Sequence, residues 1–382
     1  MKKYYCMYLI VLVLLSGCTT TPVKENTSNQ SISNIKVENI KDIIPISKEI
    51  VKDQKIKVKS YILNAQTGER INTDILFDEV PNLFQMHGYD IYSSAYQYYK
   101  DRLVIGCQSG GGKSYVYKIS DDGQLTVDTV NYNILYYDEN KRLYIAQTDE
   151  GYVTLNEKYA VNEEFPVLKD SNITTKDQRF ILQAYGVNEI YYLGRYGEKT
   201  YQLMKYNSNE KKLVKVYDLV EELKQQGIDF EEGSEINPKM TLYKEGQKSY
   251  ISISVDRIWN GKDDFKEINK NILINILINI TNNVAIFDNA FEEDDSAYPE
   301  LDFSRNVMQS SDKISIFKLN EGKIIRVNDY NAEDIINDGD NHINYIYRMD
   351  DKEIIMNVPS GVVKYNIAED KSEQLYVDRL EE

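Results

Sequence analysis

Histidine, cysteine and tryptophan are scarce in this chain of 382 residues, which has two, three and one of them, respectively. The two histidines, His87 and His342, form no zinc cluster with Cys107 at any recognised spacing. Basic residues are also outnumbered, with 45 Lys and Arg against 61 Asp and Glu and a formal net charge of −16. Binding to a phosphate backbone needs clustered Lys and Arg, so nucleic acid is excluded as a predicted partner.

Local catalytic motifs are missing as well. The chain has no Gly-x-Ser-x-Gly nucleophile elbow. The segment Gly110-Gly111-Gly112-Lys113-Ser114 differs from a phosphate-binding loop, because five residues rather than four separate Gly106 from Gly112. The residues after Ser114 alternate like a strand, whereas that loop needs a helix N-terminus. We interpret the segment as a glycine-rich connection between two strands, and no catalytic residue is predicted.

Two acidic segments could each form a functional site, or could simply be solvated surface segments. Glu292-Glu293-Asp294-Asp295, with Glu300 and Asp302, could supply paired carboxylates for glycosidic acid–base chemistry. The oxygen-rich run 337–341 beside His342 could hold Ca²⁺, but it lacks the spacing and the distal Glu of a calcium loop. For the first segment we favour a solvated surface loop. For the second we favour a solvated turn that follows a short helix at 332–336, so no metal is predicted.

The first residues have the pattern of an export signal. Lys2 and Lys3 form a short basic start, and an apolar stretch runs from Met7 to Leu15. Such a start, with small residues at a cleavage point, is typical of a secretory signal. The apolar run of about nine residues is far shorter than the ~20 that span a bilayer as a helix. One interpretation is an ordinary cleaved signal in which Cys18 is incidental.

Leu15-Ser16-Gly17-Cys18 resembles the lipobox of bacterial lipoproteins, which is the interpretation we favour. The resemblance implies that residues 1–17 are a signal peptide and that Cys18 carries diacylglycerol as the first residue of the mature chain. Two or three acyl chains give stable attachment, so the membrane is a predicted partner through the lipid anchor. The expected location is the extracytoplasmic face of the cell membrane. Cys107 is then expected as a small buried residue without a disulfide.

The polarity pattern divides the rest of the chain. Residues 18–55 are predicted to be the lipidated cysteine and a flexible tether, because residues 19–34 are polar and nearly free of large apolar groups. Residues 35–55 fit a short helix or a strand. From about residue 56 to 382 the apolar pattern has a period of two, which predicts strands. Its clearest case is the alternating isoleucines of 272–280.

A strand–turn–strand unit recurs along this region, and its turns are rich in Asn, Asp, Gly and Ser. The turns lie at 64–68, 120–123, 156–158, 206–210, 281–283, 320–323 and 366–370. Their mean spacing is about 50 residues, a period typical of repeat architectures. A charged turn and an apolar strand precede several of these hairpins, at 101–105, 141–145, 188–192 and 352–356. Each repeat therefore holds about four short strands, the pattern of a β-propeller blade.

The hairpin Leu63-Asn64-Ala65-Gln66-Thr67-Gly68-Glu69 resembles those of quinoprotein-type and TolB-like propellers. The resemblance implies an all-β propeller over residues 56–382, with seven blades or six larger ones. The chain lacks the Trp after each turn and the adjacent cysteine pair of the quinoproteins, so no quinone or other cofactor is predicted. Short helices are expected at 217–227 and 332–336, in rim insertions. Most of the 32 tyrosines are expected to pack structurally in the strands.

These observations predict a cell-surface lipoprotein that is not an enzyme. It would act as a recognition or scaffolding platform through its rim loops and bind an unidentified protein or glycan. The first alternative is an envelope carbohydrate-active enzyme that uses the rim carboxylates. The second is a ligand-capture lipoprotein of a transport system, a class that usually has two α/β lobes.

Overall fold

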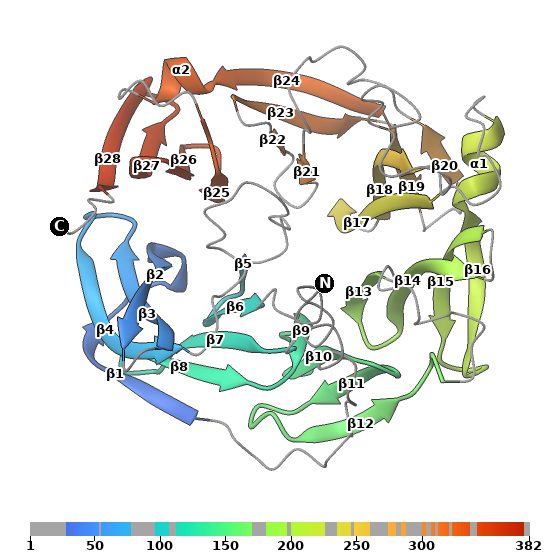
Figure 1. Cartoon of the computed structure of the whole chain (residues 1–382), viewed down its shortest axis with the longest axis horizontal. Helices are drawn as coiled ribbons and strands as arrows, with labels where there is room; N and C mark the ends of the chain where they lie inside the picture. Colours follow the sequence, from blue (N-terminus) through green and yellow to red (C-terminus); the bar gives the residue numbers. More distant parts are fainter. Residues whose placement is uncertain are drawn as a thin grey trace, which may run out of the picture.

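In the computed structural model, seven β-sheets are arranged in a ring around a central axis (Figure 1). The described residues are 28–52, 55–77, 96–106, 112–169, 181–196, 200–225, 235–245, 248–259, 274–279, 284–287, 300–302, 307–309, 312–320, 323–336 and 342–377. The ring confirms the predicted β-propeller and its count of seven blades. We number the blades 1 to 7 in chain order.

Blade 1 has three strands and blade 2 has five. Blade 1 consists of β2 (Ile43–Lys52), β3 (Lys55–Asn64) and β4 (Arg70–Phe77). Blade 2 consists of β5 (Tyr96–Tyr98), β6 (Arg102–Gly106), β7 (Ser114–Ile119) and β8 (Gln124–Val130), with β1 (Ser28–Lys36) added beside β8. A short 3-10 helix, η1 (Ile40–Asp42), precedes blade 1.

The other five blades each consist of four consecutive antiparallel strands. Blade 3 contains β9 (Asn133–Asp138), β10 (Leu143–Thr148), β11 (Gly151–Leu155) and β12 (Val161–Phe165). Blade 4 contains β13 (Ile181–Gly186), β14 (Glu189–Tyr196), β15 (Thr200–Asn207) and β16 (Lys212–Asp218). Blade 5 contains β17 (Glu235–Glu245), β18 (Lys248–Trp259), β19 (Ile274–Asn279) and β20 (Val284–Phe287).

Blades 6 and 7 repeat the same order. Blade 6 contains β21 (Glu300–Asp302), β22 (Val307–Gln309), β23 (Lys313–Asn320) and β24 (Lys323–Asn331). Blade 7 contains β25 (Tyr345–Met349), β26 (Glu353–Val358), β27 (Gly361–Asn366) and β28 (Lys371–Val377). In each of these blades the first strand is at the inner end of the sheet and the last is at the outer end (Figure 1).

Every predicted turn within the described residues occupies the same topological place. The turn at 64–68 connects β3 to β4, that at 120–123 connects β7 to β8, and that at 366–370 connects β27 to β28. The turns at 156–158 and 206–210 connect the last two strands of blades 3 and 4 in the same way. Residues 281–283 and 321–322, in the predicted turns of blades 5 and 6, lie outside the described residues. Side-chain oxygens hold several of these turns. In the first, Asn64 Oδ1 accepts hydrogen bonds from the backbone N–H groups of Gln66 at 2.8 Å and Thr67 at 3.1 Å.

The hydrophobic core consists of clusters between neighbouring blades. Separate clusters join blades 2 and 3, blades 3 and 4, blades 4 and 5, and blades 6 and 7. A larger cluster joins blades 7, 1 and 2. Many of the predicted structural tyrosines are in these clusters, and Tyr117, Tyr144 and Tyr192 are at most 1% exposed. A four-stranded sheet cannot bury both faces alone, so the blades stack.

The predicted boundary between tether and propeller at residue 56 is wrong. β2 is the inner strand of blade 1, and β1 pairs with β8, so the described sheets begin at Ser28. The polar segment 28–34 forms strand structure because β-pairing satisfies its main-chain groups on an existing sheet edge, which requires no apolar side chains. The interpretation of residues 35–55 as strand, one of the two alternatives, is confirmed for most of that range.

Both predicted short helices are present: α1 (Leu219–Gln225) after β16 and α2 (Ala332–Ile335) after β24. Leu219 of α1 is fully buried, and Ala332 and Ile335 of α2 are 1% exposed, so both helices pack their apolar residues onto the blades. Within the described ranges, no helix is long and apolar enough to cross a membrane.

Candidate functional site

Most residues that the sequence singled out lie outside the described part of the chain. These are Cys18, His87, Cys107, the acidic run 292–295 and the oxygen-rich run 337–341. His342 is described and exposed. Among the described residues, no group of three or more His, Cys, Asp and Glu could hold a metal ion.

The glycine-rich segment leads into a strand, as predicted. Gly112 has a φ of +62°, and Ser114 is the first residue of β7. Ser114 is fully buried, and its Oγ accepts a hydrogen bond of 2.9 Å from the backbone N–H of Ile134 in β9. This hydroxyl therefore connects blades 2 and 3 and is unavailable to a phosphate.

The remaining two acidic residues lie on the innermost strand of a blade. Glu300 and Asp302 are the first and last residues of β21, which is the innermost strand of blade 6 (Figure 1). In the register with β22, Glu300 lies opposite Gln309 and Asp302 lies opposite Val307. The prediction of a rim loop is therefore replaced, at these two positions, by a strand next to the axis.

Glutamine side chains connect the inner strands of neighbouring blades. Gln97 Nε2 in β5 donates a hydrogen bond of 3.1 Å to the carbonyl oxygen of Leu135 in β9. Gln183 Nε2 in β13 donates one of 3.3 Å to the carbonyl oxygen of Met240 in β17. These two contacts join the inner strands of blades 2 and 3 and of blades 4 and 5.

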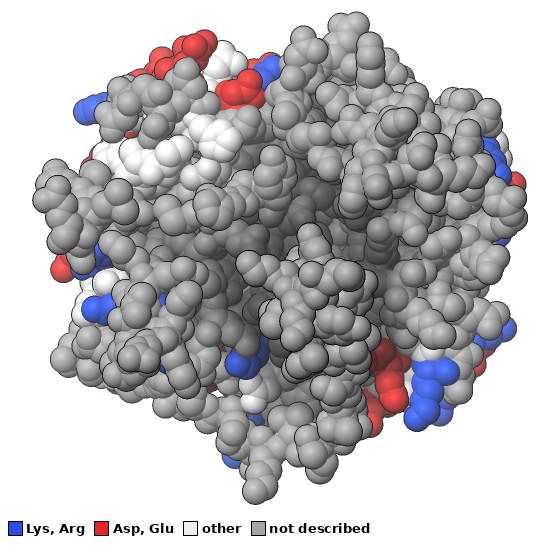
Figure 2. All heavy atoms as spheres, viewed as in Figure 1, with Lys and Arg blue, Asp and Glu red and all other residues white. Residues whose placement is uncertain are grey.

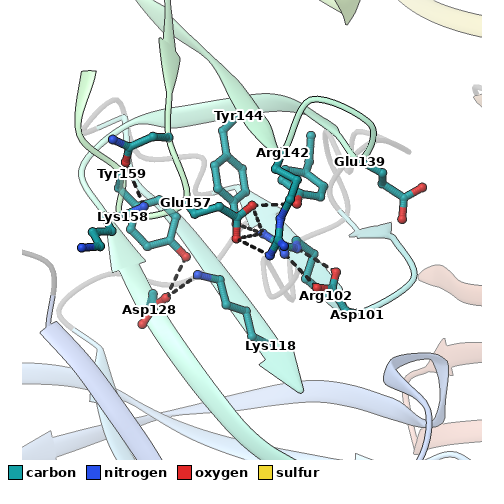
Figure 3. A network of polar contacts seen from close by, with 12 residues as sticks. Asp101, Arg102, Lys118, Asp128, Glu139, Arg142, Tyr144, Glu157, Lys158 and Tyr159 are labelled. Atoms are coloured by element: carbon teal, nitrogen blue, oxygen red, sulfur yellow. Dashed lines mark hydrogen bonds and ion pairs between the residues drawn. The ribbon is translucent and has the colours of Figure 1, made fainter. Parts of the chain in front are cut away.

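A polar cluster between blades 2 and 3 is centred on Arg102, at the start of β6 (Figure 3). The Arg102 side chain is 2% exposed. Its Nη2 is 2.8 Å from Asp101 Oδ2, and its Nη1 is 3.1 Å from Glu157 Oε1. Nη1 also donates to the Tyr144 hydroxyl, and the guanidinium carbon lies 3.9 Å from the centre of the Tyr137 ring. We call this set, with Arg142, the Arg102 network.

Glu157 is the shared acceptor of the Arg102 network. It lies in the turn between β11 and β12, and its Oε1 accepts a hydrogen bond of 2.7 Å from the Tyr137 hydroxyl. Arg142 Nη2 is 3.4 Å from Glu157 Oε2. Arg102 and Arg142 occupy similar places, since Arg102 is the first residue of β6 and Arg142 directly precedes β10, and these are the second strands of blades 2 and 3. Two successive repeats therefore direct their arginines at one carboxylate.

A second buried pair lies beside the Arg102 network. Lys118 Nζ in β7 is 3.0 Å from Asp128 Oδ2 in β8, and the Tyr159 hydroxyl from blade 3 donates to the same oxygen at 2.7 Å (Figure 3). The Lys118 ammonium also lies 4.5 Å from the centre of the Tyr159 ring. The contact again joins blades 2 and 3.

The environment fixes the protonation of these groups. The hydrogen bond from Arg102 lowers the pKa of Asp101. Burial would raise the pKa of Glu157, but the hydrogen bond from Tyr137 and the charge of Arg102 bring the net pKa below its usual value. Burial raises the pKa of Tyr144 to about 12 and also raises the pKa values of Tyr137 and Tyr159. At neutral pH the carboxyl groups of Asp101 and Glu157 are therefore ionised, and the hydroxyls of Tyr137, Tyr144 and Tyr159 are protonated.

The Arg102 network therefore acts as a connection between blades. Each of its carboxylates is paired with a cation, the Tyr137 hydroxyl donates to Glu157 and the Tyr144 hydroxyl accepts from Arg102, so none of these groups is poised as a general base. Sequence reasoning missed it because its members lie far apart in the chain. The available signal was an arginine at the start of an apolar strand, repeated as Arg102-Leu103 and Arg142-Leu143.

The charged surface is mixed. Figure 2 shows acidic and basic side chains of the described residues dispersed around the face, without a large area of one sign.

No family model matches the chain, and no curated protein matches it. Among solved structures, the periplasmic gluconolactonase PpgL of Pseudomonas aeruginosa is 7% identical with a TM-score of 0.40, over 87% of this chain and 94% of that chain. The dihydro-heme d1 dehydrogenase NirN is 10% identical with a TM-score of 0.39, over 87% of this chain and 72% of that chain. At these values the likeness gives this chain no substrate and no site residue.

The comparisons nevertheless correct two predictions. Both solved structures are named for enzymatic activities and neither is named as a recognition or scaffolding platform, so the predictions that the protein is not an enzyme and that it is such a platform have no support and are withdrawn. The error has a physical reason. Those predictions relied on the absence of local motifs, whereas a ring of blades brings together residues from segments far apart in the chain.

Proposed function

We propose that the chain is an exported enzyme of the cell envelope that hydrolyses a carbohydrate-type substrate at the axis of its ring. The observation that supports this proposal is the position of β21. This strand is innermost in blade 6 and begins and ends with acidic residues, Glu300 and Asp302.

Strand geometry suits this pair to the chemistry. Residues two positions apart in a strand have Cα atoms about 7 Å apart. Glycoside hydrolysis uses two carboxyl groups about 5–10 Å apart, one as the acid that protonates the leaving oxygen and one as base or nucleophile. In this proposal Glu300 and Asp302 take these two roles, and substrate enters along the axis.

The location is proposed from the N-terminal sequence. Leu15-Ser16-Gly17-Cys18 supports export, cleavage before Cys18 and a lipid anchor on its thiol. Replacement of Cys18 by serine should move the protein from the membrane fraction to the soluble extracytoplasmic fraction. Retention of the Cys18→Ser protein in the membrane at the original level would exclude the anchor.

The enzymatic proposal is tested with Glu300→Gln and Asp302→Asn, each of which removes a titratable group while keeping the side-chain shape. The control is Asp351→Asn, which lies exposed in the turn between β25 and β26. Two substrate classes are tested. Hydrolysis of envelope oligosaccharides is measured as the release of reducing ends, and hydrolysis of simple sugar lactones is measured as the acid released at constant pH. Both are opened by water with carboxylate assistance.

The expected result is activity on one of these classes, reduced at least ~100-fold by either variant, since an acid or base group typically contributes that much. Asp351→Asn should keep the activity, and circular dichroism should show that all three variants are folded. Equal activity in all variants, or no hydrolysis of any substrate by the parent chain, would overturn the proposal.

A further inference from the structure

The outermost strand of a blade has main-chain groups that could pair with another chain, and the described blades differ in how they prevent this. A strand at the end of a sheet leaves main-chain N–H and C=O groups that can pair with another chain, and natural proteins blunt such edges with bulges or short strands. The outermost strands β4, β12, β16, β24 and β28 all pair inward with a register shift. The outermost strand of blade 5, β20, has four residues.

β8 is the exception in the described part of the chain. Its pairing with β7 is continuous from Ser114 opposite Val130 to Ile119 opposite Leu125. Its other edge carries β1, in the register Ser28–Thr129, Asn29–Asp128, Gln30–Val127 and Ser31–Thr126. The one long, regular outer edge among the described blades is therefore the one that holds an added strand.

β1 is an arm, joined to its ring by the short segment 37–39 before η1. The register shifts between Ser31 and Lys36, so continuous pairing involves only the first four residues. Where the segment leaves the edge, the Val37 N–H donates a hydrogen bond of 2.9 Å to the carbonyl oxygen of Gly123, at the start of the β8 hairpin. The arm is therefore held by a short main-chain ladder that one strand can leave and another can enter.

We propose that the outer edge of β8 is a strand-accepting site and that neighbouring copies of the chain exchange their β1 arms across it. The exchanged arm makes the same main-chain contacts as the arm of its own ring, so exchange requires no new interface chemistry. The lipid anchor proposed at Cys18 would hold copies in one membrane at high local concentration, which favours the exchanged form. In this assembly each ring is completed by Ser28–Ser31 of its neighbour.

The test uses cysteines at the registered pair Ser31 and Thr126, in a Cys107→Ser background. Facing residues of an antiparallel pair have Cα atoms about 4.5–5.5 Å apart, a distance that a disulfide can bridge. One full-length chain carries Ser31→Cys, and a second, with an affinity tag, carries Thr126→Cys. The two are co-expressed, and the membranes are oxidised. As a control, the tagged chain carries Val161→Cys instead, at an exposed position of β12 in the next blade.

Exchange predicts a tagged, disulfide-linked dimer from the Ser31→Cys and Thr126→Cys mixture and none above background from the control mixture. A single chain with both substitutions measures pairing itself. If that chain forms only an internal disulfide and the mixture gives no dimer, exchange is overturned. If the double variant forms no disulfide of either kind, the edge does not hold β1 and the proposal fails at its first step.

Discussion

The different exposure of the charged groups in the Arg102 network predicts which of them can be replaced at the smaller cost in stability. The Arg102 side chain is 2% exposed, whereas those of Asp101 and Glu157 are 49% and 32% exposed. Replacement of both carboxylates, Asp101→Asn with Glu157→Gln, leaves a buried guanidinium without a counter-charge. Replacement of the arginine, Arg102→Met, leaves two carboxylates that water can reach and keeps an apolar chain of similar length.

The two changes should therefore differ in cost. Loss of the partner of a buried charge lowers the free energy of unfolding by about 3–5 kcal/mol. Arg102→Met should cost about 1–2 kcal/mol, the scale of lost hydrogen bonds whose other partners stay solvated. The triple variant combines Asp101→Asn, Glu157→Gln and Arg102→Met. It should be more stable than the double carboxylate variant, because it no longer contains the buried guanidinium charge without a counter-charge.

Urea unfolding of the four proteins measures these differences, provided the unfolding slopes agree. The reasoning would be refuted if Arg102→Met added to the destabilisation of the double variant, since the buried charge would then not be the source of the cost. The pH dependence gives an independent check. Both carboxyl pKa values are lowered in the folded state, so their contribution is present above the unfolded values of about 4 and is lost as the pH falls through the folded values. The stability gap between the parent chain and Arg102→Met should narrow over that acid range.

Two further substitutions test the packing of the ring. A Cβ atom on Gly151 would lie 2.1 Å from the carbonyl oxygen of Phe165, so Gly151→Ala should lower the free energy of unfolding by about 2 kcal/mol or more. Gly186→Ala meets nothing within 4 Å and should change it by less than about 1 kcal/mol in the same thermal or urea assay. Leu375→Ala opens a cavity in the cluster between blades 7, 1 and 2 and should cost about 2–4 kcal/mol by urea unfolding. A cost near zero would show that blades 7 and 1 do not close on each other.

The repeated hairpins were predictable because their signals are local. An Asn or Asp at the end of a strand, with a turn of few residues after it, has the same meaning wherever it occurs, as in the Asn64 and Asn366 turns. The start of the sheets was not predictable in this way. The segment Ser28–Ser31 has no apolar alternation, and only the edge of β8, about 100 residues later, makes it a strand.

The candidate site shows the same division between local and distant signals. The sequence identified Glu300 and Asp302 as part of an acidic run, and nothing in the run indicated that β21 lies next to the axis. The position of β21 results from the order of strands within blade 6 and from the closure of all blades into a ring. Arg102 was visible as the start of a repeat element, but its partner Glu157 lies 55 residues away in the next blade.

Ring closure explains why the contacts between blades differ. Blades 3 to 7 are each built from one continuous stretch, so the ring closes between blades 7 and 1 by side-chain contacts. Arg348 Nη1 donates a hydrogen bond of 2.7 Å to the carbonyl oxygen of Lys41, and Leu375 packs near Gly68. Extended apolar packing takes the place of a shared strand at this closure. The cluster that joins blades 7, 1 and 2 supplies that packing. Arg348 adds an ionic contact across the same closure, since its Nη1 lies 3.8 Å from Asp42 Oδ1, just as the Arg102 network adds ion pairs between blades 2 and 3.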